Sequence, residues 1–327
     1  MYNQQKSRLT SNRKSDGIFR IHPSFSPCIV WNNNSREGIA VKKVLHLWVL
    51  GGDLRQVHLA HLLAREGHLV HTYALEGASA PAPQHDLSAL SGADGVILPM
   101  PVTADGHTLF APLARAPVPL EQVLALVKPE QFLCGGRLEE GLTARFRQKG
   151  CTILDYYERE ELILANCVPT AEGAIQIAME RLPITIHGAR VLVVGCGRLG
   201  QITAQRFAAL GARVTVAARR HVHLAWAHCH GFGAEDSRDL AGRLSGYHLI
   251  INTVPALLLG AEELGDLRPD CLIIDLASKP GGVDFAAAEE LGLTAIHALA
   301  LPGKVAPATA GAIIKDTICH MLHEHGS

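Results

Sequence analysis

Three glycines, Gly195, Gly197 and Gly200, have the spacing in this chain that most clearly predicts chemistry. They directly follow the apolar run 191–194, which suits a buried strand, and they open a helical pattern over 199–210. In that context the first glycine permits a tight turn, the second lets the backbone approach a pyrophosphate, and the third lets the helix lie close to the strand. The start of the helix adds free N–H groups that favour phosphate. We therefore predict a dinucleotide-binding loop formed by Gly195, Cys196, Gly197, Arg198, Leu199 and Gly200.

The β-rich run 213–217 comes next and indicates which dinucleotide is bound. It completes a strand–helix–strand unit, which disfavours the alternative that the glycines form a structural turn without a ligand. An NAD site usually carries an acidic residue about twenty positions past the glycines, which accepts hydrogen bonds from the ribose 2′-OH. This chain has Arg219 and Arg220 at that point, and two guanidinium groups suit a 2′-phosphate. The sequence therefore favours NADP(H), the alternative being that one arginine is a solvated loop charge.

Polar residues and glycines also follow the later buried strands of this half of the chain, within 247–253, 271–275 and 293–301. Ligands bind beyond the carboxyl ends of strands in parallel sheets, so we expect these residues to meet the glycine loop. Pro-Gly pairs form turns by their own chemistry, which accounts for part of the pattern. The candidates are Thr253 and Pro255 for the cofactor, and Ser278, Lys279, Lys304 and Thr309 for the reaction site.

The first half of the chain has the same alternation of strands and helices. The pattern predicts a strand over 44–50, a turn at Gly51 and Gly52, a helix over 54–65 and a strand over 68–74. Further strands are expected over 95–98, 131–134 and 151–154, and further helices over 120–127 and 138–148. This pattern is typical of an α/β domain with a parallel sheet.

The first turn of that domain, GGDLRQ, lacks the full glycine spacing, so we expect it to face substrate rather than a second dinucleotide. Asp53, Arg55 and Gln56 then lie at the mouth of the site. The alternative makes Asp53 the N-cap of the helix and Arg55 a surface charge. Between the halves, residues 168–180 predict a helix that starts at Pro169. Glu172 in its first turn is either a dipole partner or a residue of the site.

Composition limits the class of protein. The chain has 327 residues, a formal net charge of −1 and 48% hydrophobic residues, which allows two domains and gives no general attraction to nucleic acid or to anionic membranes. No secretory signal is seen, and no run reads as long and apolar enough to cross a bilayer, so we expect a cytoplasmic protein. The eight cysteines form no C-x-x-C pair, as expected for buried thiols in a reducing compartment.

We therefore predict an α/β fold with two doubly wound parallel-sheet domains, the second a Rossmann dinucleotide-binding domain, and a C-terminal helix that crosses back to the first. Residues 1–40 are polar and proline-interrupted and are expected to be a disordered extension, with translation starting at Val41 as a hypothesis. The expected units are 1–40, the N-terminal domain 41–165, the interdomain helix 166–184, the Rossmann domain 185–305 and the crossing helix 306–327.

Histidines gather in two places, and metal binding is the alternative to solvated or packed side chains there. No carboxylate completes a set of ligands in either place, so we predict no metal site. The two groups are His221, His223, His228 and His230 with Cys229, and His320, His323 and His325.

Six motifs in this chain, in this order, resemble the A subunit of bacterial dipicolinate synthase, a sporulation enzyme. The motifs are GGDLRQ, VPTAEG, VGCGRLG, INTVPALLL, IDLASKPGG and LPGKVAPATAG, and the resemblance runs from about Val44 to the C-terminus. The chain departs from the family pattern at Lys279, where the family has arginine, and at Ala308. Lysine keeps the positive charge but loses the bidentate fork of arginine. Residues 1–40 have no counterpart in the family.

The resemblance implies an enzyme that oxidises dihydrodipicolinate, derived from 4-hydroxy-tetrahydrodipicolinate of the lysine pathway, to pyridine-2,6-dicarboxylate, with hydride transfer to NADP⁺. Such an enzyme has to hold a small dicarboxylate against the nicotinamide. Arg55, Lys279 and Lys304 are the candidates for the carboxylates, with Ser278, Thr309 and the backbone amides of Gly281 and Gly282 as neutral donors. Asp53 and Glu172 are the candidates for the proton.

The resemblance also implies a partner, the flavoprotein-like B subunit of dipicolinate synthase, and location in the mother cell of a sporulating bacterium. A homo-oligomer is compatible with the sequence. Two rival functions stay open: another NADP-dependent dehydrogenase or imine reductase acting on a 2-hydroxy or 2-imino acid, and a non-catalytic NADPH-binding sensor subunit. The expected dicarboxylate pocket argues against the sensor, and the absence of an Arg, Glu and His trio argues against a D-hydroxy-acid enzyme.

Overall fold

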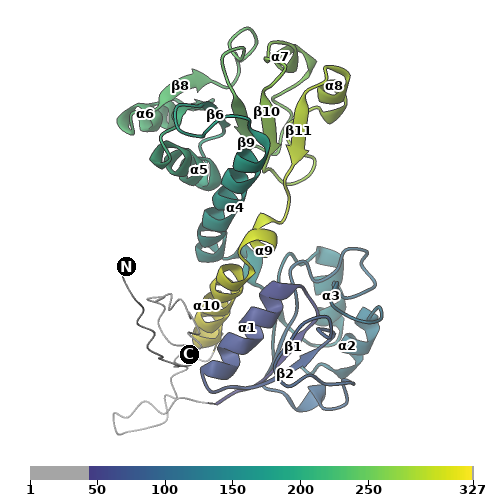
Figure 1. Ribbon diagram of the computed structural model, residues 1–327. Helices are drawn as coiled ribbons and strands as arrows, with labels where there is room; N and C mark the ends of the chain where they lie inside the picture. Colours follow the sequence, from purple (N-terminus) through teal and green to yellow (C-terminus); the bar gives the residue numbers. More distant parts are fainter. Residues whose placement is uncertain (1–43, 326–327) are drawn as a thin grey trace, which may run out of the picture.

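The computed structural model describes residues 44–325, with side chains to residue 324. Within this range the chain forms two α/β lobes, joined by the long helix α4 (Glu160–Arg181) and by the segment that contains α9 (Leu301–Val305) (Figure 1). The predictions for residues 1–40 and for a start at Val41 lie outside the described residues. The predicted fold class, two doubly wound parallel-sheet units, is confirmed. The exact domain limits stay a proposal.

The first lobe contains a parallel sheet in the order β2-β1-β3-β4-β5 within the described residues. Its strands are β1 (His46–Leu50), β2 (Leu69–Tyr73), β3 (Gly95–Ile97), β4 (Phe132–Gly135) and β5 (Ile153–Asp155). In β1, Leu47 pairs with Val70 of β2 on one side and with Gly95 of β3 on the other. This flavodoxin-like order reverses between β1 and β3, and a crevice for ligands opens beyond the strand ends at such a point.

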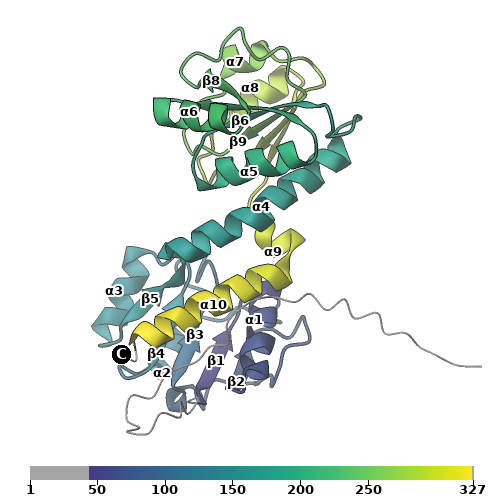
Figure 2. The same cartoon turned by 90° about the vertical axis from the view of Figure 1, so that its left-hand side faces the viewer.

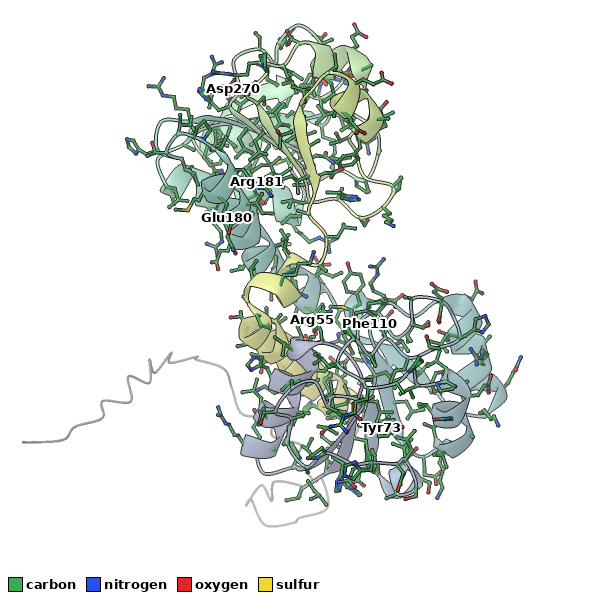
Figure 3. All side chains as sticks on the ribbon, turned by 45° about the vertical axis from the view of Figure 1, so that its right-hand side comes forward. Arg55, Tyr73, Phe110, Glu180, Arg181 and Asp270 are labelled. Carbon is green, nitrogen blue, oxygen red and sulfur yellow. The ribbon has the colours of Figure 1, made fainter. Side chains whose placement is uncertain are left out.

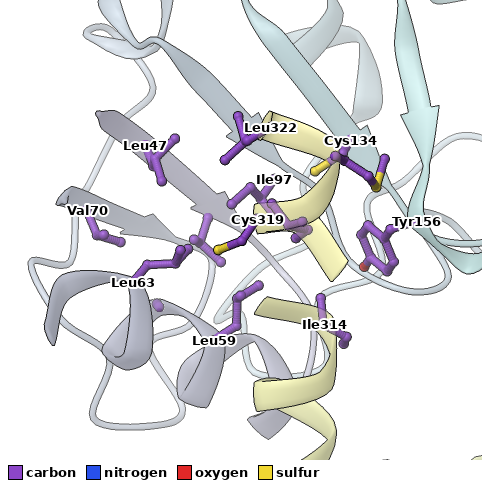
Figure 4. Packing of buried hydrophobic residues seen from close by; sticks show 14 of the residues in the cluster. Leu47, Leu59, Leu63, Val70, Ile97, Cys134, Tyr156, Ile314, Cys319 and Leu322 are labelled. Carbon is purple, nitrogen blue, oxygen red and sulfur yellow. The ribbon is translucent and has the colours of Figure 1, made fainter. Parts of the chain in front are cut away.

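Helices cover both faces of this sheet. The helices of the lobe are α1 (Leu54–Arg65), α2 (Leu120–Leu126) and α3 (Glu140–Gln148), with short 3₁₀ turns at Leu90–Gly92 and Tyr156–Glu158. The face under α1 is completed by the C-terminal helix α10 (Pro307–His325), whose Ile314 and Leu322 pack among Leu47 and Leu59 (Figure 4). Each such buried side chain contributes roughly 1.5–3 kcal/mol. The first lobe is therefore built from two distant stretches of the chain.

One glycine lets α10 approach α1 closely. A Cβ added at Gly311 would lie 2.7 Å from the backbone oxygen of Arg55 and 2.8 Å from Cβ of His58. Figure 2 shows α10 lying along α1 after the chain has returned from the second lobe. The predicted crossing helix thus packs directly on the helix that carries Arg55.

The second lobe contains a parallel sheet in the order β11-β10-β9-β6-β7-β8 within the described residues, which is the Rossmann order. Its strands are β6 (Arg190–Val194), β7 (Arg213–Ala218), β8 (Gly233–Asp236), β9 (Leu249–Asn252), β10 (Leu272–Asp275) and β11 (Thr294–His297). The other helices here are α5 (Arg198–Ala209), α6 (His221–Cys229), α7 (Ala261–Gly265) and α8 (Phe285–Glu290). The edge strand β8 was missed in the sequence because Gly-Ala-Glu-Asp has no apolar run.

Helix α4 differs from the sequence prediction at its start. It begins at Glu160, and Pro169, the predicted first residue, lies buried inside it. The prediction was wrong because a proline inside a helix costs about 3 kcal/mol, which packing on both lobes outweighs here. Next to it, the Thr170 hydroxyl donates to the carbonyl oxygen of Asn166 at 2.7 Å.

Helix α4 is also, within the described residues, the one helix that is long and apolar enough by composition to span a membrane. This corrects the sequence prediction, in which no run met that measure. In the structure α4 packs against α5, α9 and α10, and Ala171, Ala174 and Ala178 are fully buried. Contact with two lobes is therefore a sufficient reason for its apolar composition.

Candidate active site

The glycine loop after β6 has the geometry that a bound pyrophosphate requires. Gly195 has a φ of +102°, and a Cβ added there would lie 2.3 Å from Oγ1 of Thr253. A Cβ at Gly200 would lie 2.2 Å from the backbone oxygen of Gly195, so the helix rests on the turn. A Cβ at Gly197 would meet nothing within 4 Å. The backbone is thus compact at the first and third glycines and open at the second, as a dinucleotide-binding loop needs.

The start of α5 is free of side-chain capping. Gly197 occupies the N-cap position without a side-chain hydrogen bond, so the first N–H groups of α5 are not capped by a side chain. The Thr253 hydroxyl donates to the oxygen of Val194 at 2.9 Å, and the Gln201 amide donates to the oxygen of Cys196 at 3.2 Å. Burial raises the pKa of the Cys196 thiol, which keeps the thiol neutral beside a phosphate site. These residues fit a dinucleotide.

Arg219 and Arg220 lie directly after β7, and both are exposed. The acid nearest to that strand end in the sheet is Asp236, whose backbone pairs with Ala218. Its carboxylate is held by Arg238 through bonds of 2.9 and 2.5 Å, and hydrogen bonding from Arg238 lowers the pKa of Asp236. The neighbouring Glu235, which pairs with Ala217, is likewise bound by Arg243 at 3.2 Å. Both acids therefore have partners of their own, and the two arginines remain available to an anion.

A buried polar network holds the loop after β10. The Asn252 amide donates to Oδ1 of Asp275 at 2.8 Å, and both residues are fully buried. The same carboxylate accepts from the backbone N–H of Ala277 at 2.9 Å and of Gly282 at 2.8 Å. A Cβ at Gly282 would lie 2.4 Å from the Asn252 amide nitrogen, so glycine is required here for the close approach. Between these anchor points the loop carries Ser278 and Lys279, both exposed.

Asp53 and Arg55 form one unit at the end of β1. The Asp53 carboxylate caps α1 by accepting from the backbone N–H of Arg55 at 3.0 Å, as the N-cap alternative expects. The other part of that alternative is wrong, because Arg55 is buried and is not a surface charge. The buried Arg55 guanidinium donates to both oxygens of Asp53 at 2.8 Å and to the carbonyl oxygen of Met100 at 2.8 Å. Gly303 of α9 lies against both side chains, since a Cβ there would be 3.0 Å from Nε of Arg55. Figure 3 shows Arg55 below that turn, at the junction of the lobes.

The remaining candidates are placed as follows. Lys304 on α9 and Thr309 in the first turn of α10 are exposed, and the close contact of Gly303 brings α9 next to the Asp53 and Arg55 unit. Pro255 after β9 is exposed as well. Their roles stay predictions.

Glu172 is not brought to this unit. It is exposed on α4, and its Oε1 lies 3.8 Å from Nη2 of Arg206 on α5. The neighbouring Gly173 is the residue that faces α9, because a Cβ there would lie 3.0 Å from Cβ of Leu301. Because α4 begins at Glu160, Glu172 lies in the middle of the helix, and the expected role as a dipole partner in the first turn is wrong. The structure shows an ion pair with Arg206 instead, while the role of Glu172 in the site stays a prediction.

Sequence reasoning missed a pocket of about 460 Å³ at the carboxyl ends of β3, β4 and β5. Arg137 and Tyr157 line it, together with Thr103, Glu139 and Glu158. The signal was present in the sequence, because polar residues directly follow the two predicted strands 131–134 and 151–154. Ligands bind beyond the carboxyl ends of parallel strands, and this rule, which we used for the second half of the chain, would have found these residues in the first half as well.

Within residues 44–324 the side chains of His, Cys, Asp and Glu form no group of three that could hold a metal ion. His230 instead stacks on Trp226 with ring centroids 4.2 Å apart. The prediction of no metal stays a prediction.

Comparison with known proteins agrees with the geometry of both lobes. Residues 46–157 match the family described as the N-terminal domain of the dipicolinate synthase A subunit, and residues 182–281 match a putative NAD(P)-binding family. The chain is 32% identical over 289 residues to the dipicolinate synthase A subunit of Bacillus subtilis, which covers 86% of this chain and 96% of that protein. It is 28% identical over 201 residues to an NADP⁺ shikimate dehydrogenase of Bordetella petrii, covering 52% of this chain and 70% of that protein.

Comparison with solved structures also relates the chain to dipicolinate synthase A subunits. The crystal structure of the dipicolinate synthase A subunit from Bacillus halodurans superposes with a TM-score of 0.79 at 31% identity, covering 86% of this chain and 99% of that one. A transhydrogenase of Sinorhizobium meliloti, with a TM-score of 0.64 at 15% identity over 85% of this chain and 94% of that one, shares the fold alone. A relative above 30% identity over nearly its whole length, together with a complete dinucleotide loop, establishes that this nicotinamide-dependent oxidoreductase belongs to the family of dipicolinate synthase A subunits.

Proposed function

We propose that this chain oxidises dihydrodipicolinate to pyridine-2,6-dicarboxylate and transfers the hydride to NADP⁺. The single observation that carries the proposal is a relative named for this synthase that spans both lobes, including the dinucleotide loop. The ring loses one hydride and one proton in this reaction. The hydride goes to the nicotinamide, and the proton goes to a base of the protein. Aromatisation drives this step, so the protein mainly has to position the ring and exclude competing reactions.

Residues of the second lobe bind the cofactor and one substrate carboxylate in this proposal, and residues of the first lobe accept the proton. The loop from Gly195 to Gly200 holds the pyrophosphate, and Asp275 with Asn252 fixes the loop that presents Ser278 and Lys279 to a carboxylate. We propose Asp53 as the proton acceptor, since Arg55 holds both of its oxygens in one orientation at the end of β1. Lys304, Thr309 and the backbone amides of Gly281 and Gly282 remain proposed donors to the substrate carboxylates.

Arg219 and Arg220 are proposed to select NADP⁺ over NAD⁺. Their replacement by alanine together is expected to weaken NADPH binding about ten- to a hundredfold and to leave NADH binding unchanged, because only NADPH carries the 2′-phosphate. Titration of both cofactors by nucleotide fluorescence measures this. Arg268→Ala removes a half-buried arginine of the same lobe, paired with Asp270, and serves as the control. An equal loss for both cofactors in the double variant would contradict the assignment.

Two further proposals concern the setting of the enzyme. The relatives are named as A subunits, which supports a partner, and we propose that a flavoprotein-like B subunit of the synthase associates with this chain as well. We expect the protein in the cytoplasm, in the mother cell of a sporulating bacterium.

The test is a coupled assay with NADP⁺ and substrate formed in situ from aspartate semialdehyde and pyruvate by the lysine-pathway synthase. Absorbance of the reduced nicotinamide and the formation of pyridine-2,6-dicarboxylate are followed together, without and with the B subunit. We expect the two signals to rise in equal amounts. If neither product forms even with the B subunit, the synthase assignment fails, and oxidation of another 2-hydroxy or 2-imino acid becomes the better hypothesis.

A further inference from the structure

The pocket at the ends of β3, β4 and β5 belongs to no function assigned so far. Its volume of about 460 Å³ lies within the range of small-molecule sites. A Cβ at Gly136, the residue before Arg137, would lie 2.6 Å from the Tyr156 ring and 2.7 Å from Cβ of Met100. The chain that leads from β4 to the pocket is thus tightly packed.

Arg137 is presented to this pocket by a fixed turn. Its φ is +57°, a conformation that a non-glycine residue adopts at a cost. The Asp155 carboxylate holds the turn by accepting from the backbone N–H groups of Arg137 at 3.0 Å, Leu138 at 2.7 Å and Tyr157 at 2.7 Å. Asp155 therefore acts on the backbone and leaves the guanidinium of Arg137 free of it.

The Arg137 side chain makes no ion pair with any residue in the described part of the chain. Its guanidinium carbon lies 5.7 Å from the centre of the Tyr157 ring, and both side chains are exposed along the pocket wall. A guanidinium fork next to an aromatic face suits a ligand that is both planar and carboxylated. Three acids line the same pocket: Asp155, whose charge is partly offset by its three backbone N–H donors, and the exposed and solvated Glu139 and Glu158. A carboxylate can therefore enter only in direct contact with Arg137, and a second negative charge inside the pocket is disfavoured.

Two contacts are made where the lobes join. At one end Gly303, which follows β11, lies against Arg55, which follows β1. At the other end Arg198, which follows β6, forms an ion pair with Glu160, which follows β5. Gly303 lies in α9 and Glu160 at the start of α4, so both contacts involve the segments that join the lobes. Their partners Arg55 and Arg198 follow β1 and β6, so strand ends of both sheets border this junction.

We infer that this pocket is the subsite for one carboxylate and the ring of the planar dicarboxylate substrate, with Arg137 as the carboxylate-binding residue and Tyr157 as the ring contact. The inference rests on the proposed function for the identity of the substrate. One end of the molecule enters between Arg137 and Tyr157. Its other carboxylate stays outside, kept out by Glu139 and Glu158, and is directed to the loop of Ser278 and Lys279. This arrangement selects a small ring with two separate carboxylates, such as the pair that flanks the ring nitrogen in a 2,6-dicarboxylate.

The test compares binding of pyridine-2,6-dicarboxylate and pyridine-2-carboxylate, measured by titration calorimetry in the presence of NADPH. The wild-type protein is expected to bind the dicarboxylate more tightly than the monocarboxylate. Arg137→Ala is expected to weaken dicarboxylate binding roughly ten- to a hundredfold, because charge-assisted hydrogen bonds to the carboxylate are lost. The same variant is expected to abolish the preference for the dicarboxylate over the monocarboxylate. Arg137→Lys keeps the charge but not the fork and is expected to restore part of the affinity.

Arg115→Ala is the matched control, since Arg115 is an exposed arginine of the same lobe outside the pocket, and it should bind both ligands as the wild type does. NADPH affinity should be unchanged in every variant. Dicarboxylate binding that is equal in Arg137→Ala and wild type, or absent in the wild type, would overturn the subsite. Turnover of the wild type is measured separately, so a protein that binds the dicarboxylate through Arg137 but forms no product refutes the proposed reaction and leaves the subsite standing.

Discussion

Replacing Gly197 by valine is expected to lower NADPH affinity about a hundredfold while the free energy of unfolding stays almost unchanged. The structure leaves open space within 4 Å of a Cβ at this position, and its φ of −80° suits any residue. The side chain would occupy the space through which the pyrophosphate reaches the N–H groups of α5. Loss of two charge-assisted hydrogen bonds of about 1.5 kcal/mol each gives that factor. NADPH fluorescence titration and urea unfolding measure the two quantities.

Gly200→Ala is the informative contrast, because its Cβ would lie 2.2 Å from the backbone oxygen of Gly195. Here we expect a lower free energy of unfolding, by about 1–3 kcal/mol, as well as weaker NADPH binding. Gly265→Val provides a control in the same lobe, since that position is also open. If Gly197→Val binds NADPH as tightly as the wild type does, the pyrophosphate does not approach along this path and the site has to be placed elsewhere.

Replacing Asp275 by alanine is expected to lower the free energy of unfolding by about 3–5 kcal/mol, a large effect for a single substitution. The variant leaves the Asn252 amide and the backbone N–H groups of Ala277 and Gly282 buried without their acceptor, and each such group costs about 1–3 kcal/mol. Activity should fall as well, because the loop with Ser278 and Lys279 loses two of its anchor points. Urea unfolding followed by circular dichroism, with kcat and KM from the coupled assay, measures both effects.

Asp275→Asn separates volume from charge. It keeps the shape of the side chain but turns an NH₂ group towards a backbone donor, so we expect a smaller yet clear loss of stability. Asp270→Ala, which removes an exposed acid of the same lobe, should change little. A free energy of unfolding in Asp275→Ala within about 1 kcal/mol of the wild type would contradict the network as the element that holds this loop.

The dinucleotide loop in the second half of the chain could be predicted from the sequence because it depends on residues that are close together in the chain. The turn at Gly195, the resting contact at Gly200 and the open position at Gly197 all follow from residues within a few positions of one another. Backbone conformation and steric contact act over that range, so spacing alone predicted their roles. Helix α1 was predicted with the limits it has in the structure for the same reason, an apolar period framed by a capping Asp53.

The start of α4 and the strand β8 were decided by the tertiary structure. Pro169 reads locally as a helix start, and only the packing of α4 on both lobes shows that the helix continues through it. Residues Gly233–Asp236 have no apolar run, and their strand exists because β7 offers an unpaired edge. In both places a distant partner outweighs local preference.

The sequence by itself determined the fold class, the dinucleotide loop and the resemblance to the family, since each is written in residue types at fixed spacing. The tertiary structure alone decided which side chains share a site. It ties Arg55 to Asp53 and Met100, turns Glu172 towards Arg206, and joins Arg137 to Tyr157 in one pocket. These pairings depend on how helices and sheets far apart in the chain pack, and packing is a property of the whole set of contacts that no local spacing encodes.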